Sequence, residues 1–74
     1  MINSWTKEQI QALKRDACAR RDDALIDEEL IKLNLHLSNY DKATLITTKN
    51  AEWKVIEEIA LELSSRLHAR AVSN

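Results

Sequence analysis

Residues 20–29 of this 74-residue chain read RRDDALIDEE, and this stretch decides how many helices the fold contains. Two arginines run into a group of five acidic residues that has no base within it. Cationic side chains stabilise the carboxyl end of a helix, and anionic side chains stabilise the amino end. The order of charges therefore predicts that one helix ends and another begins near residues 21–24.

The apolar residues on the two sides of this stretch follow different helical faces. One stripe is formed by Ile10, Leu13 and Ala17; a second, with the 4-3-4-3 spacing of a heptad seam, is formed by Ile26, Leu30, Leu33, Leu37 and Tyr40. At about 100° per residue the two stripes would lie almost opposite each other on one straight helix. A break lets both face one core. A single continuous helix remains an alternative, because no glycine or proline enforces the stop.

Two helices are accordingly expected in the first half of the chain, over about 7–21 and about 24–39. Thr6 and Gln9 have the spacing of a capping box at the start of the first one. Trp5 and Ile10 occupy the two positions of a hydrophobic staple, although Trp5 is also a candidate anchor for a partner.

A third helix is expected over about 49–71, and its apolar stripe has 3-4-3-4 spacing: Trp53, Ile56, Ala60, Leu63 and Leu67. Thr44–Thr48 is rich in β-branched residues, which resist helix formation modestly, so a start at residue 49 or 50 is favoured. Leu45 and Ile46 are in phase with this helix, and they leave open a start as early as residue 42.

The absence of glycine and proline points to an all-α fold, since tight turns between strands mostly use those two residues. We therefore predict one small three-helix domain over residues 1–74, or a helical hairpin if the first two helices are continuous.

A core of this size is marginal, and small domains gain support from disulfides, metals or association. Cys18 is the only cysteine, and Cys18, His36 and His68 do not have the spacing of a zinc site. We therefore expect no metal, and either a homodimer or a partner protein helix. The interface candidates are Trp5, Leu25, Ile31, Leu35, Trp53, Ile56, Leu63 and Leu67.

The charge balance argues against nucleic acid as a partner, because 11 basic residues are matched by 12 acidic ones. The basic group Lys14, Arg15, Arg20 and Arg21 supports a small DNA-binding regulator as the alternative function. No apolar run approaches the roughly 20 residues of a membrane span, and the first residues lack the apolar core of a signal peptide. A cytoplasmic protein is expected, since a single thiol suits a reducing compartment.

Signs of enzymatic chemistry are weak. His36 and His68 each stand alone, and the acids of 22–29 lack the glycine and the alternating ligands of a calcium loop. A glycine-rich phosphate loop is absent. We expect no catalytic residues, no cofactor and no small-molecule substrate.

Residues 50–70, NAEWKVIEEIALELSSRLHAR, together with the length and composition of the chain, resemble the short helical accessory proteins of temperate bacteriophage early regions and prophages. This resemblance implies a regulator that modulates a host or phage protein by binding it. The sequence thus predicts a non-enzymatic protein-interaction module.

Overall fold

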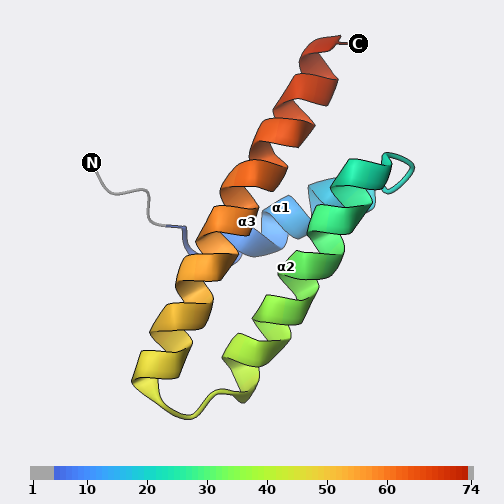
Figure 1. Ribbon diagram of the computed structural model, residues 1–74. Helices are drawn as coiled ribbons and strands as arrows, with labels where there is room; N and C mark the ends of the chain where they lie inside the picture. The colour runs from blue at the N-terminus through green and yellow to red at the C-terminus, as the bar shows by residue number, and fades with distance from the viewer. Residues whose placement is uncertain (1–4, 74) are drawn as a thin grey trace.

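The computed structural model describes residues 5–73, and the side chains of 5–69, as an all-helical domain (Figure 1). Its three helices are α1 (Lys7–Cys18), α2 (Ala24–Lys42) and α3 (Ile46–Ser73). α2 and α3 run antiparallel side by side, and α1 crosses behind them and packs against both (Figure 1). The predicted all-α three-helix fold is confirmed, and the single continuous helix over α1 and α2 is excluded.

The start of α1 has the predicted cap. The Thr6 hydroxyl accepts a hydrogen bond from the backbone N–H of Gln9 at 3.1 Å, and the Gln9 side chain accepts one from the backbone N–H of Thr6 at 2.9 Å. Two amides that the helix cannot satisfy are thereby paired. Trp5 is partly buried against the core cluster that contains Ile10.

The break between α1 and α2 is a tight turn over residues 19–23. The backbone N–H of Arg20 donates to the Ala17 carbonyl at 2.9 Å, and that of Asp23 donates to the Arg20 carbonyl at 3.1 Å. The predicted end of the first helix at residue 21 is wrong, since α1 ends at Cys18. Asp23 is extended, and its carboxylate caps α2. The chain must leave the helical conformation before Asp23 to reach that geometry.

Replacing Asp23 with alanine should destabilise the domain, because its carboxylate accepts from the backbone N–H groups of Leu25 at 3.0 Å and Ile26 at 3.4 Å. Loss of such a cap costs about 1 kcal/mol. We expect Asp23→Ala to lower the free energy of unfolding by that amount in urea titrations. Asp23→Asn is the matched control, because it keeps the accepting oxygen and should retain most of the stability. Equal midpoints for Asp23→Ala and the wild type would contradict this role.

The core lies where the three helices meet, and its buried apolar side chains belong to the predicted stripes except for Ile59, which widens the buried face of α3. They are Ile10, Leu13, Ala17, Ile26, Leu30, Leu33, Leu37, Ile56, Ile59, Ala60 and Leu63. Tyr40, Trp53 and Leu67 are partly buried at its edge. Ala17 and Ala60 have no exposed surface. Their small side chains let neighbouring helices approach closely in a densely packed interior.

The connection between α2 and α3 is shorter than predicted, since α2 continues to Lys42 and α3 begins at Ile46. The expected bounds at residues 39 and 49 are both corrected. The Lys49 ammonium donates to the Tyr40 carbonyl at 2.9 Å and lies 4.3 Å from the centre of the Tyr40 ring. This tie joins the end of α2 to the first turn of α3, where the threonines are helical despite their modest penalty.

α3 extends beyond the helix it packs against. Its 28 residues span about 42 Å and the 19 residues of α2 about 28 Å, at ~1.5 Å per residue. Because the two helices meet near the 43–45 connection, the carboxyl-terminal part of α3 projects past the start of α2 (Figure 1).

Candidate functional site

The outward face of α2 carries a second heptad-like seam. We define the outward seam as Ala24, Glu28, Ile31, Leu35, Ser38 and Lys42, which have 4-3-4-3-4 spacing and are all exposed. The core residues of α2 occupy the opposite side of the helix, at positions such as Ile26, Leu33 and Leu37. The outward seam therefore points away from both α1 and α3.

The centre of the outward seam is apolar. Ile31 is 59% exposed and Leu35 is 57% exposed, and they are four residues apart, so their side chains are neighbours on the helix surface. The face opposite the core of an amphipathic helix normally carries polar residues. An apolar centre with Glu28, Ser38 and Lys42 around it has the composition of a small protein interface with a polar rim.

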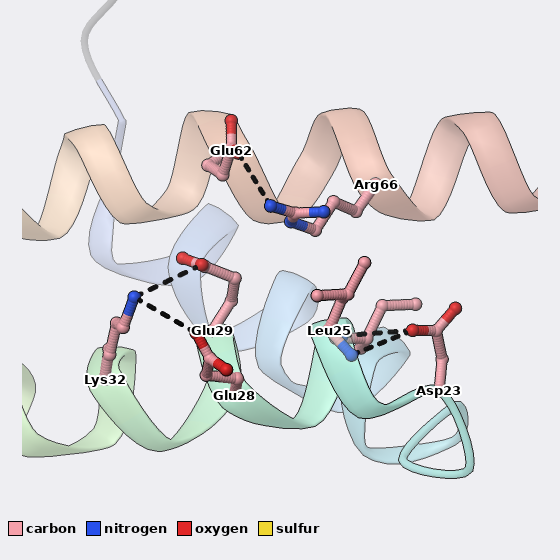
Figure 2. Close-up of polar contacts among 8 residues, drawn as sticks. Asp23, Leu25, Glu28, Glu29, Lys32, Glu62 and Arg66 are labelled. Carbon is pink, nitrogen blue, oxygen red and sulfur yellow. Dashed lines mark hydrogen bonds and ion pairs between the residues drawn. The ribbon is translucent and has the colours of Figure 1, made fainter.

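Leu25 does not belong to this seam. It is 54% exposed, but the helical phase turns it about 120° away from Ile31. Figure 2 shows its side chain pointing from the first turn of α2 towards α3. The structure thus divides the exposed candidates of α2 between two faces.

The candidates on α3 belong mainly to the core. Ile56 and Leu63 have no exposed surface, so no partner can contact them in the folded domain, and their prediction as interface residues is corrected. Their spacing gave no sign of whether the chain itself or a partner would cover them. Trp53 packs against Tyr40 with ring centres 5.2 Å apart, and Leu67 is partly buried.

Trp5 ties the start of the chain to α3. Its backbone N–H donates to the Glu57 carboxylate at 3.0 Å. Trp5 and Leu61 line a shallow depression of about 170 Å³, whose other walls are Lys54, Glu57 and Glu58. Leu61 is 57% exposed, and it was not among the candidates predicted from the sequence. In the sequence, Leu61 is distinguished only as an apolar residue on the side of α3 away from its apolar stripe.

Leu45 and Ile46 are two further exposed apolar residues that the sequence did not single out as interface candidates. They lie where the connection joins α3, and they are 65% and 69% exposed. Their phase with the α3 stripe left open an earlier start of this helix, and α3 does begin at Ile46, but both side chains remain exposed.

Polar contacts hold α2 and α3 in register. The His36 ring nitrogen Nδ1 lies 2.8 Å from the Glu52 carboxylate, and both side chains are partly buried. Sequence reasoning treated His36 as an isolated histidine, since its partner is 16 positions away and only the antiparallel packing brings them together. Because His36 lies on α2 and Glu52 on α3, the pair links the two helices.

Charged side chains near the start of α2 pair mainly within their own helices. Glu29 is buried, and its carboxylate lies 3.5 Å from the Lys32 ammonium, which also lies 3.6 Å from Glu28 (Figure 2). Arg66 donates to Glu62, one helical turn earlier in α3, at 3.0 Å. Nε of Arg66 is buried, and it has no hydrogen-bond partner among the described residues.

The four basic candidates for nucleic acid do not form a cluster free of acids. Arg21 donates from Nε to Asp27 at 2.8 Å, and this hydrogen bond and the Asp27 charge raise the pKa of Arg21. Lys14 and Arg20 are partly buried, and Arg15 is exposed. Arg20 and Arg21 directly precede two aspartates, so the local charge is mixed. This arrangement gives no particular support to phosphate binding.

Neither a metal site nor a membrane-spanning helix is found among the described residues. That part of the chain contains no group of three or more histidine, cysteine or acidic side chains arranged to hold a metal ion. None of the helices within it combines the length and the apolar character that a membrane crossing requires.

Comparisons with known proteins give no relative. No protein-family model matches the chain, and neither curated proteins nor solved structures yield a significant match. Its function must therefore be inferred from its own residues.

Proposed function

We propose that this chain is a small non-enzymatic interaction module that binds a protein helix through the outward seam of α2. The observation that supports the proposal is the exposed pair Ile31 and Leu35, placed on the face of α2 opposite the core. Single exposed apolar residues are common on protein surfaces. Two adjacent ones at the centre of a heptad-like seam favour a helical partner with an apolar stripe of its own.

The energetics are consistent with a binding surface of modest strength. Full burial of one isoleucine or leucine side chain contributes about 1.5–3 kcal/mol. Ile31 and Leu35 each keep more than half of their surface exposed, so a partner that covers both gains roughly half of that amount from each. Polar contacts from Glu28, Ser38 and Lys42 would then select the orientation of the partner.

The biological setting follows from the same proposal. A domain that binds through one helix face suits a regulator that modulates another protein by occupying its surface, as the resemblance to phage accessory proteins implies. A reducing cytoplasm is the proposed location, because the only cysteine, Cys18, is an exposed free thiol.

A comparison of captured proteins tests this function. Immobilised wild-type protein and an Ile31→Lys, Leu35→Lys double variant are exposed to the same lysate, and retained proteins are identified by mass spectrometry. Leu61→Lys is the matched control, because Leu61 is as exposed as Leu35 but lies on α3. We expect a protein that the wild type and the control retain and the double variant loses. Equal retention by all three would contradict binding of another protein in that lysate through the outward seam.

A further inference from the structure

We propose that the partner on the outward seam is a second copy of this chain. The two α2 helices pair antiparallel about a two-fold axis, and Ile31 of each copy packs against Leu35 of the other. This inference rests on the proposed function and specifies its partner.

The spacing of the outward seam matches its own reverse. The intervals 4-3-4-3-4 read the same in both directions, with their midpoint at position 33. In an antiparallel pair centred there, position 31 faces 35, position 28 faces 38 and position 24 faces 42. Each seam position of one copy therefore meets a seam position of the other, as a two-fold interface requires. The alternating spacing also suits the knobs-into-holes packing of two helices.

The charges of the outward seam favour the antiparallel direction. Glu28 lies in the amino-terminal half of the seam and Lys42 lies at its carboxyl end. In the antiparallel pair, Lys42 faces Ala24 of the other copy, one helical turn from Glu28, and the small alanine leaves room for the lysine stem. Two-fold symmetry forms this opposite-charge contact twice. A parallel pair would instead place Glu28 on Glu28 and Lys42 on Lys42, which is repulsive.

The rest of the domain leaves this pairing unobstructed. α1 and α3 pack against the buried side of α2, and all six seam positions are exposed. In Figure 1 α3 lies to the left of α2 and α1 crosses behind it, so a second α2 can approach the side of α2 that is turned away from both. The apolar centre of the contact contains only two side chains from each copy, so the dimer should be weak and depend strongly on concentration.

Sedimentation equilibrium tests the self-association, with samples from about 10 µM to about 1 mM under reducing conditions. The wild type should shift from monomer towards dimer across this range. Leu35→Lys should weaken dimerisation at least about tenfold, whereas Leu61→Lys should behave as the wild type. Circular dichroism checks that each variant is folded, as expected for exposed positions. A monomeric wild type throughout, or equal loss in both variants, would overturn the proposal.

Oxidative cross-linking tests the direction of the pair, in a Cys18→Ser background that removes the native thiol. The two probes are Glu28→Cys and Ser38→Cys, which face each other only in the antiparallel register. We expect a cross-linked dimer when the two variants are mixed and none from either variant alone. Efficient cross-linking of Ser38→Cys by itself would show a parallel pair and overturn the proposal.

These outcomes are separable from those of the proposed function. If the wild type stays monomeric while the capture comparison still finds a protein lost only by the α2 double variant, the self-pairing is wrong and the interaction module stands. If neither measurement depends on Ile31 and Leu35, both proposals are wrong.

Discussion

Ile56→Asp is expected to unfold the domain in buffer without denaturant. Ile56 has no exposed surface and lies in the core. Its helical neighbours one turn away are Glu52, Trp53, Ile59 and Ala60, so α3 supplies no cation to pair with a new carboxylate. An unpaired charge in such a site costs several kcal/mol or forces the carboxyl group to be protonated. A core of this size supplies only about 3–5 kcal/mol, so the substitution should exceed the whole stability.

Ile46→Asp is the matched control for this prediction. Ile46 is the same residue type in the same helix, but it is 69% exposed and lies in the first turn of α3. An acid near a helix amino terminus is favourable, so the control should be as stable as the wild type. Far-UV circular dichroism and urea titration separate the two outcomes. A helical Ile56→Asp protein with an unchanged urea midpoint would show that the core is placed wrongly.

The second large effect is expected at Ile10, which has no exposed surface and is the largest fully buried side chain of α1. α1 is short, and only two more of its side chains, Leu13 and Ala17, are buried. Ile10→Ala removes buried methyl groups and leaves a cavity, which costs about 2–5 kcal/mol. We expect a loss of most of the free energy of unfolding, measured by urea titration.

Gln11→Ala is the control for Ile10→Ala, because Gln11 is the next residue and is exposed. Alanine has the higher helix propensity, so this variant should be at least as stable as the wild type. Hydrogen exchange adds a local measurement, since the amides of α1 should lose protection in Ile10→Ala. If Ile10→Ala lost no more unfolding free energy than Gln11→Ala, the buried face of α1 would not be what holds this helix to the domain.

These predictions divide the apolar residues of the chain into two functional groups. Substitutions at Ile10 and Ile56 act on folding, because their surroundings are filled by the chain itself. Substitutions at Ile31 and Leu35 should leave folding intact and act on association, because their surroundings are solvent in the single chain. Among variants that remain folded, a stability measurement should therefore respond to substitutions of core residues, and an association measurement to substitutions of Ile31 and Leu35.

The sequence by itself determined the class of the fold and the approximate position of each helix. The lack of glycine and proline, the capping box at Thr6 and Gln9, and the charge reversal at 20–29 are local signals. These signals depend only on composition or on residues that are close together in the sequence, so they do not require knowledge of how the helices pack. The core stripes were also predictable, because apolar periodicity defines a helix face wherever the helix packs.

Only the tertiary structure decided what each face meets. The Lys49 contact with Tyr40 and the His36–Glu52 pair both join α2 to α3, and they depend on the antiparallel register of these two helices. The inner and outward seams of α2 both have heptad-like spacing, so spacing alone cannot say which one the chain covers. Packing resolves this, because α1 and α3 fill the inner side and leave Ile31 and Leu35 in solvent.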